Sequence, residues 1–124
     1  MITLADVEAA AKRLSGRVLR TPTVSCAAVS AASGADVVLK LENLQVTGAF
    51  KERGAANRLQ LLSDRERERG VIAMSAGNHA QAVARHAQLS NVGATIVMPK
   101  FTPSTKVTRT ASWGASVPCP AITP

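Results

Sequence analysis

The apolar positions at the start of the chain recur at the spacing of a helix. They lie on one face of residues 4–14, and charged side chains occupy the other face. Thr3 and Asp6 stand three residues apart in front of this pattern, which is the spacing of a capping box. A second, Ala-rich helix is expected over residues 25–33, directly before a glycine.

Three later stretches have the patterns of strands. Residues 35–43 alternate apolar and polar side chains, which is typical of a strand with one buried face. Residues 71–74 and 94–98 are short apolar runs, and such runs predict buried strands. A further strand could begin within residues 115–117.

Helices are predicted between these strands, over residues 51–62, 78–89 and 103–111, the last with Pro at its start. The side chains expected to face the core are those of Ala55, Leu59, Leu62, Ala80, Val83, Ala84 and Ala87. The mixed-charge stretch 63–70 is expected to be a solvated turn or helix end. The alternation of strands and helices predicts an α/β fold with a parallel sheet and flanking helices.

The composition favours an aliphatic core and argues against a nucleic-acid binder. The 124 residues include two Phe, one Trp and no Tyr, so few aromatic rings could stack on bases. The formal net charge of +7 makes nucleic acid or an anionic ligand worth considering. However, the basic residues are dispersed along the chain, and no carboxylate follows Glu68. We therefore expect no nucleic-acid partner.

The cysteines and the apolar runs indicate a reduced, aqueous compartment. Cys26 and Cys119 are far apart and match no metal-ligand spacing, so no metal site is expected. No apolar run approaches the ~20 residues of a membrane span. The first residues also lack the apolar core of a signal peptide. We expect a cytoplasmic protein without a membrane partner.

Two segments carry candidate chemistry, and each lies where a predicted strand gives way to a helix. Ligands bind at this edge in parallel α/β sheets. In the first segment, Gly48 and Ala49 allow the backbone to approach a flat group, and Phe50 offers an apolar wall beside Lys51. A lysine at a helix start is usually only a solvated side chain. Its neighbours make Lys51 a candidate nucleophile for a carbonyl group.

The second segment is the turn before the helix predicted at residues 78–89. Free backbone N–H groups at a helix start favour an anion, such as the carboxylate of a substrate. The alternative is an ordinary turn between strand and helix with Asn78 at the cap. Arg85 and His86 match no motif, and we expect both on the surface of the helix.

The residues of these two segments resemble a known enzyme family. Residues 41–55 read LENLQVTGAFKERGA, and residues 74–81 read MSAGNHAQ. These strings are similar to the lysine motif and the asparagine loop of pyridoxal-phosphate dependent threonine ammonia-lyases and their serine dehydratase and serine racemase relatives. The similarity covers about residues 3–117. It implies the fold-type II (tryptophan synthase β-like) architecture, with its two α/β domains.

The resemblance implies that the chain holds only part of this architecture. Residues 1–50 would belong to the large domain, residues 51–117 would form small-domain-like βα units, and residues 118–124 would form an irregular tail. Full-length relatives are roughly two to three times longer. They are expected to be homo-oligomers, and their glycine-rich phosphate loop lies beyond residue 124.

The resemblance also implies a cofactor and a set of site residues. Lys51 would bond to pyridoxal 5'-phosphate and later act as the base at the substrate Cα. Phe50 would pack beside the cofactor, and Asn78 would hydrogen-bond its 3′-oxygen. The substrate carboxylate would be held by Ser75, Ala76, Gly77, Asn78 and His79. Ala49 stands where many relatives have Ser, and Ala82 where most have Gly.

The implied reaction is β-elimination of threonine or serine to 2-oxobutyrate or pyruvate and ammonia, in amino-acid metabolism that includes isoleucine biosynthesis. We expect this activity to be impaired in a chain of this length. A serine racemase-like enzyme and a non-catalytic remnant are the alternatives, and a basic nucleic-acid binder is a weaker one. We also expect the apolar faces of strands 37–44 and 94–98 to stay partly exposed.

Overall fold

The computed structural model describes residues 1–118, and Cys119 with the rest of the expected tail lies outside the described residues. The helices are α1 (Leu4–Leu14), α2 (Ala27–Ser33), α3 (Lys51–Gln60), α4 (Asp64–Arg69), α5 (Asn78–Leu89) and α6 (Ser104–Ala111), with a 3-10 turn η1 (Glu42–Leu44). The strands are β1 (Thr23–Ser25), β2 (Val38–Lys40), β3 (Val71–Met74) and β4 (Ala94–Val97). These elements confirm the α/β class and most of the predicted positions.

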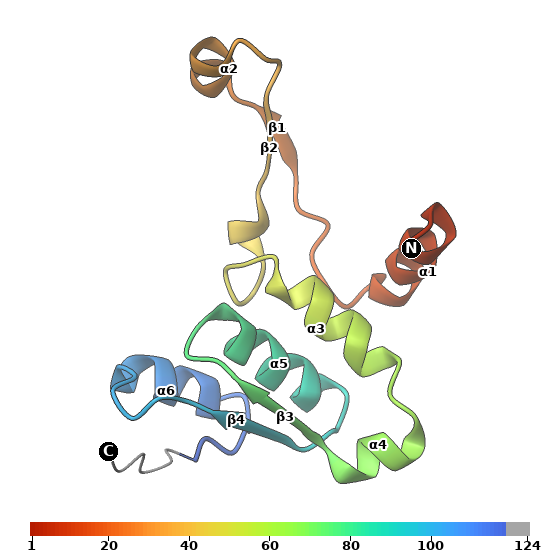
Figure 1. Cartoon of the computed structure of the whole chain (residues 1–124), viewed down its shortest axis with the longest axis vertical. Coiled ribbons are helices and arrows are strands. Elements are labelled where there is room, and N and C mark those ends of the chain that lie inside the picture. Colours follow the sequence, from red (N-terminus) through yellow and green to blue (C-terminus); the bar gives the residue numbers. More distant parts are fainter. Residues whose placement is uncertain (119–124) are drawn as a thin grey trace.

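The part of the fold that holds the predicted site is a small parallel sheet with helices packed beside it. Strands β3 and β4 pair in parallel, with Val71 opposite Ala94. Ser116 forms a parallel bridge to Thr95, so the strand expected at residues 115–117 is present as a single bridge. Helix α5 lies on this sheet, and both α3 and α6 pack against α5 (Figure 1).

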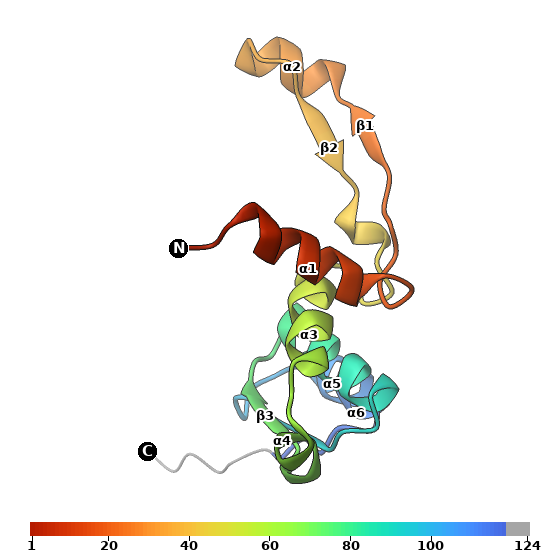
Figure 2. The same ribbon diagram turned by 90° about the vertical axis from the view of Figure 1, so that its right-hand side faces the viewer.

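Strand β2 lies outside the parallel sheet, which corrects the predicted topology. It pairs antiparallel with β1, with Thr23 opposite Lys40. The two strands and α2 form an arm that extends away from the α3–α5 layer in both views (Figures 1 and 2). Alternation predicts a strand but does not select its partner, and β1 has only three residues to signal its presence. Every residue of β2 is exposed, as expected for this segment.

The core forms where α5 covers β4. Ile96 and Met98 are fully buried, and they pack with Ala80 and Ala84 of α5. The predicted inward positions on α5 are confirmed, because Val83 and Ala87 are buried too. Alanine side chains let the helix approach the sheet closely.

The two parallel strands differ in burial from the prediction. Residues 94–98 are exposed only in part: α5 buries Ile96 and Met98, and Val97 is half-buried. Strand β3 is not fully buried, since Ile72 is 74% and Met74 is 80% exposed. These two side chains alternate with Val71 and Ala73, which pack on the core. Within residues 1–118, β3 therefore has one covered face and one open face.

Local interactions explain the helix starts. The capping box of α1 is present as predicted: the N–H of Thr3 donates to Asp6 Oδ2 at 2.8 Å, and Thr3 Oγ1 accepts from the N–H of Asp6. Ser63 and Glu66 form a second capping box, which makes the mixed-charge stretch a short helix, α4. Pro103 stands at the N-cap of α6. These contacts lie within four residues, so the sequence specifies them directly.

Candidate functional site

Lys51 is the first residue of α3 and is exposed. Gly48, with φ of 74°, turns the chain from η1 toward the helix, and Phe50 is the N-cap residue. The Nζ of Lys51 lies 5.2 Å from the centre of the Phe50 ring. Phe50 is 60% exposed and Lys51 is exposed, so the apolar wall lies beside the amine without burying it.

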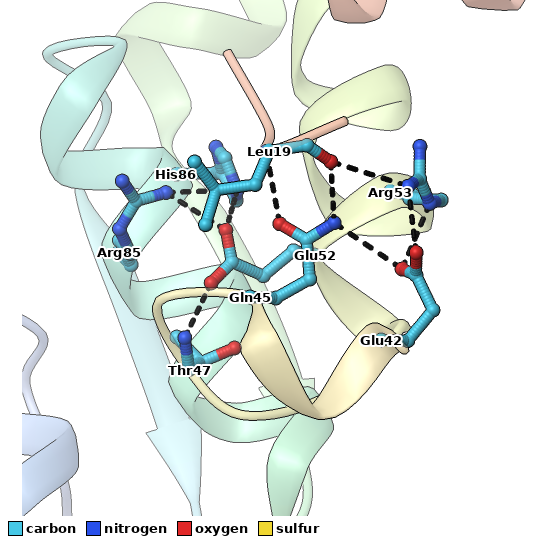
Figure 3. Close-up of polar contacts among 8 residues, drawn as sticks. All are labelled: Leu19, Glu42, Gln45, Thr47, Glu52, Arg53, Arg85 and His86. Atoms are coloured by element: carbon cyan, nitrogen blue, oxygen red, sulfur yellow. Dashed lines mark hydrogen bonds and ion pairs between the residues drawn. The ribbon is translucent and has the colours of Figure 1, made fainter. Parts of the chain in front are cut away.

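A charged network fixes the chain just before this lysine. Arg53 donates to both carboxylate oxygens of Glu42, at 2.7 and 2.8 Å (Figure 3). Gln45 exchanges two hydrogen bonds with the backbone of Leu19, at 2.9 and 3.0 Å. Hydrogen bonding from Arg53 lowers the pKa of Glu42 to about 2, and Thr21 and Gln45 add to this effect. The glutamate, the glutamine and the arginine of the first motif thus act as structural anchors.

The second segment is a tight loop between β3 and α5. Gly77 is the N-cap residue of α5, where it provides no side-chain cap, and Asn78 and His79 form the first turn of the helix. Ser75 Oγ accepts a hydrogen bond from the N–H of Gly77 at 3.2 Å. Ser75, Ala76 and Gly77 are half-buried. The first N–H groups of α5 therefore have no side-chain cap, and the helix dipole favours an anion beside them.

One cavity joins the two segments. It has a volume of about 320 Å³ and is lined by Phe50, Lys51, Arg53, Gly54, Ala55 and His79. His79 and Lys51 thus line the same cavity, although 28 positions separate them in the sequence. The other predicted residues, Ser75, Ala76, Gly77 and Asn78, lie next along the chain but do not line this cavity.

A larger cavity of about 380 Å³ lies beside the first one. It is bounded by α3, α4 and β3, and it shares Gly54, Ala55 and His79 with the smaller cavity. Lys51 does not line it. We assign the candidate site to the smaller cavity, because a covalent cofactor site needs its nucleophile at the wall.

The residues present suit the reactive end of pyridoxal phosphate. Gly54 lies inside α3, and apart from its chain neighbours and its own helix backbone a Cβ there would meet no atom within 4 Å, so packing against other segments does not require glycine. Two buried oxygens near the segments, Thr47 Oγ1 and Gln81 Oε1, have no hydrogen-bond partner within residues 1–118. An amine, an aromatic wall, a helix start and spare polar atoms are the groups that such a cofactor needs around its ring. The sequence has no glycine-rich loop for its phosphate.

Arg85 and His86 are not surface residues, which corrects the sequence-based expectation. His86 is 3% exposed, and the Arg85 side chain is 14% exposed. Both contact the carboxylate of Glu52, which lies in the first motif but had no role assigned to it (Figure 3). Burial lowers the pKa of His86, although Glu52 acts in the opposite direction. Charged residues on a helix are exposed by default, so only the packing of α3 on α5 identifies this cluster.

Comparison with known proteins identifies the family. A family model described as "pyridoxal-phosphate dependent enzyme" matches residues 14–118. The chain belongs to this family. It is 50% identical over 117 residues to the L-threonine ammonia-lyase of Thermotoga maritima, covering 94% of this chain and 29% of that protein. It is 48% identical over 115 residues to the L-threo-3-hydroxyaspartate ammonia-lyase of Saccharomyces cerevisiae, covering 93% and 35%.

Solved structures of pyridoxal-phosphate dependent enzymes share this fold. Serine racemase from Dictyostelium discoideum superimposes with a TM-score of 0.91 and 34% identity, over 98% of this chain and 40% of that one. Threonine deaminase isoform 2 from Solanum lycopersicum gives 0.79 and 31%, over 96% and 36%. These similarities confirm the fold-type II class. The chain spans about a third of the length of the curated relatives it matches.

Two further features bear on other kinds of site. Among the described residues, no group of three or more His, Cys, Asp and Glu side chains could hold a metal ion. None of the helices in residues 1–118 is long and apolar enough to cross a membrane.

Proposed function

We propose that this chain provides the lysine-bearing part of a pyridoxal-phosphate dependent ammonia-lyase, with Lys51 as the residue that bonds to the cofactor. The proposed reaction is elimination of water from threonine or serine, which releases ammonia and 2-oxobutyrate or pyruvate. The observation that carries this proposal is the cavity that both Lys51 of the first segment and His79 of the second line.

Each residue of the candidate site has a separate proposed role. The Lys51 amine holds the cofactor and then removes the proton from the substrate Cα. Asn78 would hydrogen-bond the 3′-oxygen of the cofactor, and Phe50 would pack beside the cofactor. The backbone of residues 75–79 binds the substrate carboxylate at the start of α5. Bound pyridoxal phosphate supplies an electron sink for the charge that develops at Cα.

The relatives support a β-hydroxy amino acid as substrate. L-threonine ammonia-lyase and L-threo-3-hydroxyaspartate ammonia-lyase are named for such substrates. Relatives named catabolic L-threonine dehydratase, from Staphylococcus aureus, support threonine breakdown as a setting beside isoleucine biosynthesis. We further propose a cytoplasmic protein, whose residues 1–50 belong to the large domain and residues 51–117 to small-domain-like units of a homo-oligomer.

A racemase is the second candidate. The TM-score of 0.91 with a serine racemase favours it, and removal of the Cα proton by Lys51 is the first step of both reactions. The products separate the two candidates. A lyase releases a 2-oxo acid and ammonia from L-serine, whereas a racemase yields D-serine.

Reductive labelling tests the proposal. The chain is incubated with pyridoxal phosphate, reduced with borohydride and mapped by peptide mass spectrometry. We expect the label at Lys51, because this amine lies in the cavity, and no such label in Lys51→Ala. The internal controls are Lys12, Lys40, Lys100 and Lys106. Label spread evenly over all five lysines would overturn the assignment.

The same preparation distinguishes an active enzyme from a non-catalytic remnant. Release of 2-oxobutyrate from threonine is expected to be low, because the sequence provides no cradle for the phosphate dianion. Selective labelling with little turnover supports the proposal for this part of the protein. Robust turnover that persists in Lys51→Ala would contradict it.

A further inference from the structure

The residue after the candidate nucleophile is a buried carboxylate. Glu52 is 0% exposed, although it directly follows the exposed Lys51 at the start of α3. Removing a carboxylate from water is unfavourable unless hydrogen bonds and an opposite charge compensate it. The carboxylate of Glu52 therefore needs hydrogen-bond donors and a positive charge inside the fold.

Three donors saturate this carboxylate. Its Oε1 accepts the backbone N–H of Thr47 at 2.5 Å. Its Oε2 accepts from Arg85 Nη1 at 2.9 Å and contacts His86 Nε2 at 3.0 Å (Figure 3). Arg85 balances the negative charge, and His86, whose pKa burial lowers, donates as a neutral ring. We call Glu52, Arg85 and His86 the buried triad.

The buried triad connects the two segments of the candidate site. Thr47 begins the turn that leads into Lys51, so its bond to Glu52 fixes the backbone on the N-terminal side of the lysine. Arg85 lies seven residues after Asn78, and this is two helical turns along the same face of α5. Arg85 also lies 5.7 Å from the centre of the Trp113 ring, beyond the end of α6. One carboxylate thus ties the lysine turn to the helix that begins at Asn78.

Stability alone does not explain a buried triad. Apolar side chains of similar volume stabilise a core as well as a buried ion pair does, or better. A saturated carboxylate, in contrast, requires each donor at a defined distance and direction. Such a carboxylate therefore fixes the positions of its donors relative to one another. Glu52 does not line the Lys51 cavity, so it acts through position and not by contact with a ligand.

We propose that Glu52, held by Arg85 and His86, is a positioning residue that fixes the turn carrying Lys51 relative to the start of α5 at Asn78. This inference rests on the proposed function for its consequence at Lys51. Its structural part, the link between residue 47 and the middle of α5, is testable without any cofactor.

The first test uses Glu52→Gln in the full chain. The amide keeps the shape of the side chain but replaces one of the two acceptor oxygens with an NH2 group. That NH2 group would face another donor, either the Thr47 N–H or the side chains of Arg85 and His86. We expect amide hydrogen exchange at residues 47–50 to rise about tenfold without cofactor. We also expect the fraction of reductive label at Lys51 to fall about tenfold. Glu66→Gln is the matched control, because Glu66 of α4 forms an exposed ion pair with Arg58 of α3.

The second test separates geometry from stability. The triple variant Glu52→Leu, Arg85→Met, His86→Leu replaces the buried triad with apolar side chains. We expect a melting temperature close to that of the wild type, with Lys51 labelling still as low as in Glu52→Gln. The proposal is overturned if either folded variant labels Lys51 like the wild type. It is also overturned if both variants fail to fold, since the role would then be structural only.

Labelling of the wild type separates failure of the proposed function from failure of the role assigned to Glu52. If the wild type itself shows no preference for Lys51, the proposed function fails, and the consequence assigned to Glu52 fails with it. If the wild type is selective and Glu52→Gln is equally selective, the proposed function stands and only the role of Glu52 fails.

Discussion

At the scale of single residues, Glu42 shows how one carboxylate organises the approach to the candidate site. It is bound at two points by Arg53, and Thr21 and Gln45 also donate to it. Its side chain is mostly buried, so solvent screens these contacts only in part. The pKa of Glu42 is therefore lowered, to about 2.

The first prediction concerns Glu42→Gln. Because the folded pKa of about 2 lies below the ordinary value of 4.5, the stabilisation is complete above pH 4.5 and is lost as the pH falls toward 2. We expect the variant to lose about 1–3 kcal/mol of unfolding free energy at neutral pH. The difference from the wild type should shrink in acid. Urea unfolding at several pH values measures it, with Glu8→Gln on the exposed side of α1 as control.

At the scale of elements, α3 contains a glycine that its own packing does not require. Gly54 is exposed in the helix, and apart from its chain neighbours and its own helix backbone a Cβ there would meet no atom within 4 Å. Glycine inside a helix is about 1 kcal/mol less favourable than alanine. The residue lines both cavities, so its missing side chain leaves space at the candidate site.

The second prediction is that Gly54→Ala affects stability and ligand binding in opposite directions. We expect up to about 1 kcal/mol of added stability without cofactor, from helix propensity. Reductive labelling of Lys51 should decrease, because the methyl group stands at the cavity wall. Gly70→Ala is the contrasting variant: its φ is +77°, and its Cβ would lie 2.6 Å from the Gly93 carbonyl oxygen. That variant should lose stability, and unchanged labelling in Gly54→Ala would contradict the assignment of the cavity.

At the scale of the whole molecule, apolar surface remains open on two of the strands, β3 and β2. Ile72 and Met74 project from β3 on the face opposite the core, and Val38 and Leu39 are exposed on the arm. The relatives are about three times longer, and the described residues provide no cover for these side chains. An exposed apolar strand with an open edge favours association.

The third prediction is that the 124-residue chain associates in solution through β3. We expect light scattering to show species larger than 12.9 kDa, with the fraction growing with concentration. The double variant Ile72→Thr, Met74→Thr should shift the distribution toward monomer, because it keeps the strand while removing apolar area. A pair on the arm, Val38→Thr with Leu39→Thr, shows whether the second surface contributes. A wild type that stays monomeric at high concentration would refute the prediction.

Much of the fold followed from short-range patterns. The capping box at Thr3, the helix bounds of α1 and α5, and the alanine face of α5 are set by residues within a few positions of one another. The position of Lys51 at a helix start and of residues 75–79 before α5 also followed, because a strand-to-helix turn is a local feature.

Only the tertiary structure decided pairing and burial. The sequence determined that residues 38–40 form a strand. Its antiparallel pairing with β1 became clear only in the folded arm, where α2 connects the two strands. The sequence determined that Arg85 and His86 lie on a helix, but α3 packed on α5 buried them against Glu52. Hydrogen-bond partners and burial depend on contacts between residues distant in the chain, and periodicity carries no information about such contacts.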